Sequence, residues 1–162
     1  MTENLFQVSR CGEMYHACPT SLYLEKYKYD LLNKICPKYS YGAKNSFAVC
    51  DIYISKNNVT LKRFDNYVLK YCYNEKKLYE TPYKGLALIL LKSIIINELN
   101  KDNITLETEF IVVNVNKENE KLVKYYQSIS FVDSDGRSMH SNIKDFLKIT
   151  ENIDLIECIY TN

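Results

Sequence analysis

Six residues at the start of a predicted helix could bind an anion. The sequence PYKGLA at 82–87 opens a long apolar run that predicts a helix over residues 81–100. The first backbone N–H groups of a helix have no partner within it, and they point toward an approaching anion. Gly85 would let phosphate groups approach the backbone, and Lys84 could add positive charge. An ordinary strand-to-helix turn has the same features, so this stretch alone leaves both interpretations open.

A second stretch, 110–131, combines a strand, a helix and the start of another strand. Its first residues, FIVVNV, are mostly β-branched and form a nearly continuous apolar run, which predicts a strand covered on both faces. Four later residues recur at the spacing that places them on one face of a helix. These residues are Asn119, Leu122, Val123 and Tyr126. Phe131 then begins the next extended segment.

This second stretch resembles the signature of the GNAT superfamily of acyl-CoA N-acyltransferases. In that family a strand ends in valine, an asparagine precedes the next helix, and the helix ends in tyrosine before a glycine–phenylalanine pair. Val115, Asn119, Tyr126 and Phe131 have the spacing of that signature, and Ser130 stands in the place of the glycine. The strand, helix and strand context agrees with the spacing.

The family's diphosphate-binding loop precedes the long helix, and the first stretch lies at that place. Gly85 and Ala87 match the pattern of the loop, whereas Pro82 replaces its usual arginine or glutamine. The resemblance therefore implies acetyl-CoA as the acyl donor, with its diphosphate bound by the backbone of five residues. These are Tyr83, Lys84, Gly85, Leu86 and Ala87.

The resemblance also implies a place for the pantetheine arm of acetyl-CoA. In the family, the strand before the loop and the strand after the long helix splay apart, and the arm lies between them. Residues 77–80 would then line one side, and 111–113, with Val112 and Val113, the other. Asn119 would contact the arm from the second helix, and its alternative interpretation is a helix N-terminal cap.

By resemblance, Tyr126 is the general acid that protonates the departing thiolate of CoA. A phenol, with a pKa of about 10, suits a leaving group of similar basicity. The alternative is a core tyrosine on an amphipathic helix. The general base could be Glu80, Glu107 or Glu109, at the ends of the flanking strands, and the sequence does not select among them. Solvated carboxylates with no role in catalysis are the ordinary alternative.

Composition limits the class of protein. A chain of 162 residues fits one domain, so we expect a single GNAT-like domain over 1–162. The formal charge of +1 gives no indication of a nucleic-acid or membrane partner, and no apolar run reaches the length that crosses a bilayer. Six scattered cysteines without a secretory signal predict reduced thiols in a cytoplasmic protein. No residue pattern predicts a metal site.

The order of elements predicts an α+β fold with three layers. We expect a GNAT-like, mostly antiparallel central sheet, with helices on both faces and a splay between its two central strands. The first half of the chain is predicted to form a strand at 5–9, a helix at 19–35, an antiparallel meander at 46–80 and a helix at 81–100. The second half is predicted to form a strand at 106–115, a helix at 118–128 and a strand at 131–133 followed by a hairpin turn at 134–136. A short helix at 143–147 and a strand at 155–160 complete the prediction.

The sequence therefore predicts an N-acetyltransferase that moves an acetyl group from acetyl-CoA to an amine by direct attack. Pro82, Ser130 and the lack of an evident base motivate an alternative, a catalytically inactive GNAT-like domain that serves as a binding or scaffold module. An unrelated α+β interaction protein is the third interpretation. The amine acceptor, and the choice between a monomer and a homodimer, stay open.

Overall fold

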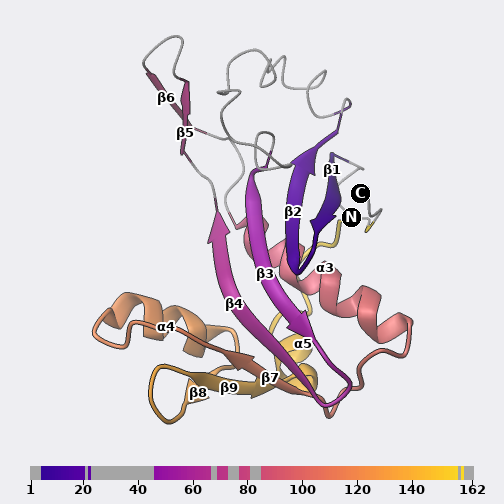
Figure 1. Ribbon diagram of the computed structural model, residues 1–162, viewed down its shortest axis with the longest axis vertical. Helices are drawn as coiled ribbons and strands as arrows, with labels where there is room; N and C mark the ends of the chain where they lie inside the picture. The colour runs from indigo at the N-terminus through magenta and orange to yellow at the C-terminus, as the bar shows by residue number, and fades with distance from the viewer. Residues whose placement is uncertain are drawn as a thin grey trace. The chain divides into compact units, whose positions relative to one another are not determined.

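The computed structural model describes residues 5–20, 22, 46–66, 69–72, 77–80, 85–156 and 158. This part of the chain is α+β, with a mostly antiparallel, open sheet of seven strands, a separate pair of strands and three helices (Figure 1). The α+β class and the mostly antiparallel sheet predicted from the sequence are confirmed. The chain divides into two compact units: unit 1 draws on 1–50, 64–93 and 154–162, and unit 2 on 51–63 and 94–153.

The large sheet has the strand order β1-β2-β3-β4-β7-β9-β8. Its strands are β1 (Phe6–Cys11), β2 (Met14–Pro19), β3 (Ala48–Ile54), β4 (Asn58–Asn66), β7 (Glu109–Val112), β8 (Val132–Asp133) and β9 (Met139–Asn142). The helices are α3 (Leu86–Asn100), α4 (Glu120–Ser128) and α5 (Ile143–Ile149). β5 (Leu69–Cys72) and β6 (Lys77–Glu80) form the second, two-stranded sheet.

One pair of neighbouring strands in the large sheet runs in parallel. β4 pairs with β7 in a register that joins Asn58 to Glu109 and Leu61 to Val112. Parallel neighbours need a long crossover connection, and here the chain between them contains α3. The β1–β2, β7–β9 and β8–β9 pairs are antiparallel.

Unit 1 contains a hairpin that the sequence did not reveal. β1 and β2 join at Gly12, whose φ of 61° is the left-handed conformation that glycine adopts readily. Phe6 of β1 meets Phe47 edge-on, with ring centroids 6.0 Å apart. The thiol of Cys50 on β3 donates to the carbonyl of Ala87 on α3, at 3.8 Å. The first half of α3 is therefore packed against β3.

The four described cysteines, Cys11, Cys18, Cys50 and Cys158, form no disulfide bond. Burial, and then the charge of Asp65, raise the pKa of the Cys50 thiol well above its ordinary value. Cys50 is thus protonated and unreactive, since the thiolate is the nucleophilic form.

Unit 2 has an aromatic core on one face of its strands. Phe110 of β7 meets Phe131 and Phe146 edge-on, with ring centroids 4.9 and 5.2 Å apart. Tyr126 of α4 meets Phe131 in the same manner at 5.8 Å. Both α5 and the C-terminal end of α4 therefore pack on the Phe110 face. The opposite face carries side chains that keep solvent contact, Val132 being 63% exposed.

Three expectations about the fold need correction. The segment 46–80 is divided between two sheets, because β5 and β6 pair with each other. Pro19 ends β2 and does not open the predicted helix. Leu22 is helical, and residues 21 and 23–35 lie outside the described residues. Leu155 and Ile156 form no strand. The expectation that helices cover both faces of the sheet stays a prediction.

Candidate functional site

The N-terminus of α3 is the predicted diphosphate site, and one of its amides is already bonded. Gly85 has a φ of 76°, a conformation that favours glycine, and the first buried residues of α3 follow it. The N–H of Ala87 donates to Oδ1 of Asn66 at 2.6 Å. Glycine has no side chain to cap its own helix, so the last residue of β4 provides the cap. Tyr83 and Lys84 lie outside the described residues.

Asn66 is a helix cap that sequence reasoning missed. The only signal in the sequence was the pair Asp65-Asn66, which indicates the end of a strand. Ala87 is 1% exposed, so its N–H has little access to solvent if Asn66 moves away. A phosphate oxygen at this position would therefore have to displace the Asn66 carboxamide. Of the predicted cradle, Ala87 is thus already bonded, and the roles of Gly85 and Leu86 stay predictions.

The parallel strands β4 and β7 separate after four paired residues. The last hydrogen bond between them joins the N–H of Val113 to the carbonyl of Leu61, at 3.1 Å. Asn114 then has a φ of 58°, which turns the chain, and the N–H of Val115 donates to the carbonyl of Arg137 at 2.8 Å. From this point the two strands diverge (Figure 1).

This geometry changes the predicted walls of the pantetheine gap. Residues 77–80 form β6, which pairs with β5 and not with the strand that contains Val112. The strand beside β7 is β4. Val112 is buried against the core of unit 2, whereas Val113 is half-buried at the point of divergence. A gap beside β7 would therefore have β4 as its other wall.

Asn119 caps α4, which confirms the interpretation of this residue as a helix cap. Its backbone is extended, and its Oδ1 accepts a hydrogen bond from the N–H of Leu122 at 3.1 Å. Asn116 accepts from the N–H of Glu118 in the same turn, at 3.2 Å. The side chain of Asn119 is exposed, so a contact between its amide nitrogen and a ligand stays a prediction.

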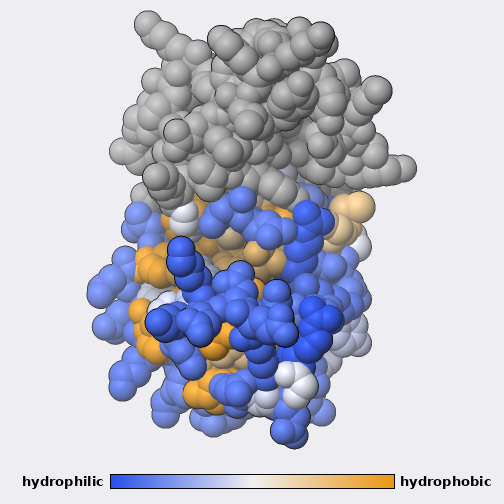
Figure 2. Space-filling view, turned by 90° about the vertical axis from the view of Figure 1, so that its left-hand side faces the viewer, coloured by the Kyte–Doolittle hydropathy of each residue, from blue (hydrophilic) through white to orange (hydrophobic). Residues whose placement is uncertain are grey.

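Tyr126 is the buried residue of α4, with 7% of its surface exposed. Its ring lies edge-on to those of Phe131 and Tyr125, the latter at 5.9 Å. Leu122 and Val123 are half-buried, and the α4 side of the molecule is mainly hydrophilic over its described part (Figure 2). Tyr126 therefore has the packing of a core tyrosine, and its role as an acid stays a prediction.

The three candidate carboxylates occupy different places. Glu80 ends β6 in the two-stranded sheet. Glu107 is exposed in the turn before β7. Glu109 begins β7, and its Oε1 accepts from Nδ1 of His140 on β9 at 2.6 Å. His140 was missed because it lies 31 residues away in sequence, and only the β7–β9 register brings the two together.

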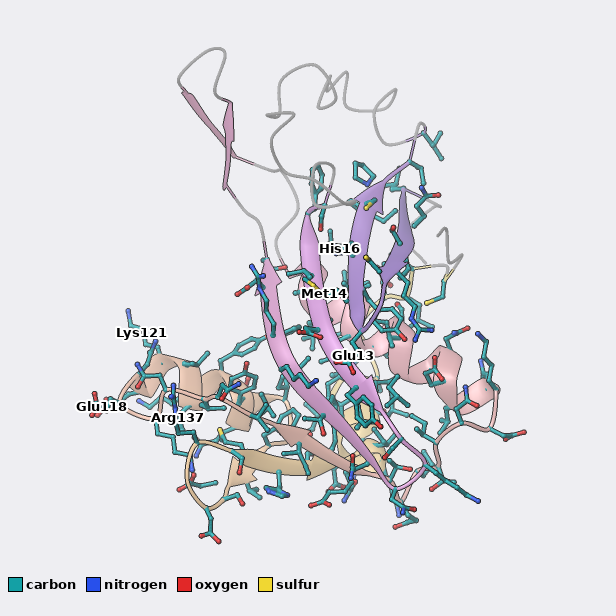
Figure 3. All side chains as sticks on the ribbon, in the orientation of Figure 1. Glu13, Met14, His16, Glu118, Lys121 and Arg137 are labelled. Atoms are coloured by element: carbon teal, nitrogen blue, oxygen red, sulfur yellow. The ribbon has the colours of Figure 1, made fainter. Side chains whose placement is uncertain are left out.

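An open hollow of about 450 Å³ lies between the start of α4 and the β8–β9 turn. Its lining residues are Val115, Asn116, Lys117, Glu118, Gly136 and Arg137. Figure 3 shows Glu118, Lys121 and Arg137 close together at this end of α4. Charges of both signs line or surround the hollow.

Lys117 forms an ion pair with Asp133 of β8, so the positive charge of Lys117 is partly neutralised. Its Nζ lies 2.6 Å from Oδ1 of Asp133 and also donates to the carbonyl of Ser134. The hydrogen bond from Lys117, and then that from the N–H of Ser134, lower the pKa of Asp133.

Within the described residues no three His, Cys, Asp or Glu side chains gather as metal ligands would, and no helix there is long and apolar enough to span a bilayer. The sequence matches no protein-family model and none of the curated proteins compared with it.

Proposed function

We propose that the chain is an N-acyltransferase that transfers the acetyl group of acetyl-CoA directly to an amine. The observation that carries the proposal is the parallel pair β4–β7, linked through α3 and diverging after Leu61 and Val113. The resemblance stated above calls for this arrangement, in which the strand before the long helix and the strand after it splay apart. In this proposal β4 takes the place of the residues expected from the sequence as the strand beside β7.

A diverging parallel pair offers hydrogen-bonding backbone groups to a ligand. Beyond the last shared bond, the facing edges of two strands present N–H and C=O groups that no longer satisfy each other. The pantetheine arm carries two amide groups on a narrow chain, so it can take the place of a strand between them. Tyr126, one helix later, would protonate the sulfur.

A second candidate function has specific support. The amide of Ala87 is occupied by Asn66, and Asn119 already caps α4. Both observations favour a GNAT-like module that has lost catalysis and serves in binding or as a scaffold. The two candidates differ in whether acetyl-CoA binds and whether it reacts.

Titration calorimetry with acetyl-CoA, followed by an assay of thiol release with amines, tests the proposal. We expect binding and turnover for the wild type. Tyr126→Phe should reduce kcat by about 10²–10⁴-fold, the usual contribution of a positioned acid, with little change in Kd for acetyl-CoA. Tyr125→Phe, the same change at the neighbouring, 37% exposed tyrosine, is the matched control and should leave kcat unchanged.

The outcomes separate the candidates. No detectable binding at millimolar acetyl-CoA would exclude acyl transfer. Binding without thiol release from any amine would favour the inactive module. Turnover that Tyr126→Phe leaves unaltered would remove Tyr126 from the mechanism.

A further inference from the structure

We infer that Ser130, through a hydrogen bond to Ser141, is a positioning residue for Tyr126; this rests on the proposed acyl transfer, in which Tyr126 protonates the departing thiolate. In the family that this chain resembles, a glycine stands where Ser130 stands here. The side chain of Ser130 makes a hydrogen bond that a glycine could not make. The departure from the family pattern therefore adds a contact at the end of the helix that carries the proposed acid.

The end of α4 closes on the backbone of Tyr126. The N–H of Phe131 donates to the carbonyl of Tyr126 at 3.0 Å, and the N–H of Ser130 donates to the carbonyl of Gln127 at 3.3 Å. These two bonds, around a residue with positive φ, form a Schellman motif. The rings of Tyr126 and Phe131, with centroids 5.8 Å apart, make the apolar contact that accompanies such a motif. The placement of Tyr126 therefore depends on the conformation of Ser130.

Ser130 has an unusual backbone conformation for a serine. Its φ is 93°, in the region that glycine usually occupies at this position of the motif. The other non-glycine residues with positive φ in the described part of the chain are Asp102 and Asn114, whose residue types adopt it more readily. A glycine would end α4 without strain, so a contact of the serine side chain must offset the strain at this position.

The hydroxyl of Ser130 makes that contact with a strand of the sheet. Its Oγ lies 2.5 Å from Oγ of Ser141 on β9. The hydroxyl of Ser141 donates its only proton to the carbonyl of Asn142 at 3.3 Å, so Ser130 is the donor in the shorter bond. The hydrogen bond between Ser130 and Ser141, named here the serine tether, joins the end of α4 to β9.

The serine tether lies on the same face of the sheet as the ring of Tyr126. Ser141 is in register with Phe110 on β7, and residues joined in register point to the same face. The ring of Phe110 meets that of Phe131 at 4.9 Å, and Phe131 in turn meets Tyr126. Tyr126 is thus attached to the sheet by ring contacts and, through the helix end at Ser130, by a hydrogen bond to β9.

A proton donor depends on its position more than a core side chain does. A general acid must lie within about 2.6–3.2 Å of the atom that it protonates, and a misplacement of about 1 Å can lower a rate by about 10²-fold. Ring contacts tolerate such a shift, because edge-on pairs form at centroid separations of about 4.5–7 Å. Hydrogen bonds between hydroxyl groups are confined to about 2.5–3.0 Å. The serine tether therefore sets the position of the helix end more sharply than the rings do.

The two serines take no part in the bonds that change. In the proposed transfer the amine nitrogen bonds to the thioester carbon, the carbon–sulfur bond breaks, and the thiolate takes the proton of the Tyr126 hydroxyl. Solvent accepts the proton that the amine loses and returns one to Tyr126. Ser130 and Ser141 exchange no proton with the substrate, so they affect the rate only while the Tyr126 hydroxyl is present.

The test is a double-mutant cycle between Ser141→Ala and Tyr126→Phe, measured as thiol release from acetyl-CoA with a lysine-containing peptide and with a diamine. In the wild-type background, Ser141→Ala should lower kcat by about 10–10²-fold and leave Kd for acetyl-CoA unchanged. In the Tyr126→Phe background the same change should leave kcat unchanged, because the acid that the tether positions is already absent. Ser141→Thr keeps a hydroxyl group and should retain the kcat of the wild type.

Ser130→Gly separates positioning from stability. Glycine adopts a φ of 93° without strain, so the variant should keep or raise the urea midpoint of the wild type, while its kcat falls as in Ser141→Ala. Ser128→Ala is the matched control and should leave kcat unchanged. Its hydroxyl is at the same end of α4, but it donates to the carbonyl of Tyr125 within the helix and not to the sheet.

Each outcome decides the inference. A fall in kcat of equal size in both backgrounds, or an unchanged kcat in Ser141→Ala and Ser130→Gly, would overturn it and leave the proposed acyl transfer intact. Turnover that Tyr126→Phe leaves unaltered would also overturn it, since there is then no acid to position. Wild type that binds no acetyl-CoA, or releases no thiol with either amine, would overturn both the inference and the proposed function.

Discussion

The two helices that the sequence singled out for ligand binding, α3 and α4, begin in different ways. α4 is capped by its own preceding residue, Asn119, which accepts from an amide three positions later. α3 is preceded by Gly85, which has no side chain for this purpose, and Asn66 from β4 takes its place. One cap is local and the other spans 21 residues.

The difference shows that the start of α3, but not that of α4, depends on a residue that only the fold brings near. The Asn119 cap forms at the exposed surface, where water can replace it. The Asn66 cap serves Ala87, which is 1% exposed, and it anchors the end of β4 to the start of α3 within unit 1. The α3 cap thus has a structural role that would compete with the binding of an anion.

The strongest test of the comparison is Asn66→Ala. Removing the Asn66 carboxamide leaves the buried N–H of Ala87 without a partner, so we expect the free energy of unfolding to fall by about 1–3 kcal/mol. Urea denaturation measures the change, and Asn57→Ala, at an exposed turn residue, is the control. If a diphosphate uses the same amide, this variant should also bind acetyl-CoA more tightly than the wild type. An unchanged unfolding free energy would show that the cap is not structural.

Elements with a strong local pattern were predicted well. The apolar run of α3 and the spacing of α4 depend on neighbouring residues. β2 was missed because MYHACP has no clear alternation, and both faces of its middle residues are buried. β7 is shorter than predicted because Asn114 takes a left-handed conformation within an otherwise strand-like run.

The site was predictable only where it depends on one segment. Asn119 as a cap follows from its place before an amphipathic helix. Asn66 at α3, His140 beside Glu109, and β4 as the partner of β7 all depend on pairings between distant segments. Spacing in the sequence does not contain the register of a sheet, so no local pattern could have supplied these three contacts.

A smaller effect is expected at the local cap. Asn119→Ala removes the acceptor for the N–H of Leu122, and loss of a cap typically costs about 1 kcal/mol. Asn119→Asp keeps an acceptor oxygen and should restore stability, which makes it the matched control. Urea denaturation should therefore rank Asn66→Ala as more damaging than Asn119→Ala. The reverse order would contradict the distinction between a buried and an exposed helix start.

The smallest effect concerns the contact that holds the loop before α4 to β8. Lys117 keeps the pKa of Asp133 below its ordinary value, so the contact stabilises the fold above the ordinary carboxyl pKa of about 4. The contribution is lost as pH falls through the lowered folded pKa, because the carboxyl group is then protonated in both states. Exposed pairs of this kind contribute little, so the change should be small.

Unfolding of the wild type and Asp133→Asn across pH 2–7 measures this contribution. The wild type should be slightly more stable near pH 7, and the two should converge at the acidic end of the series. Added salt should narrow the difference at pH 7, since the pair is exposed to solvent. Asp135→Asn, in the adjacent turn, tests whether any nearby carboxylate has the same effect. A difference between wild type and Asp133→Asn that persisted at low pH would mean that Asp133 acts through its shape and not its charge. The contact between the loop before α4 and β8 would then depend on packing, and the caps alone would distinguish the starts of the two helices.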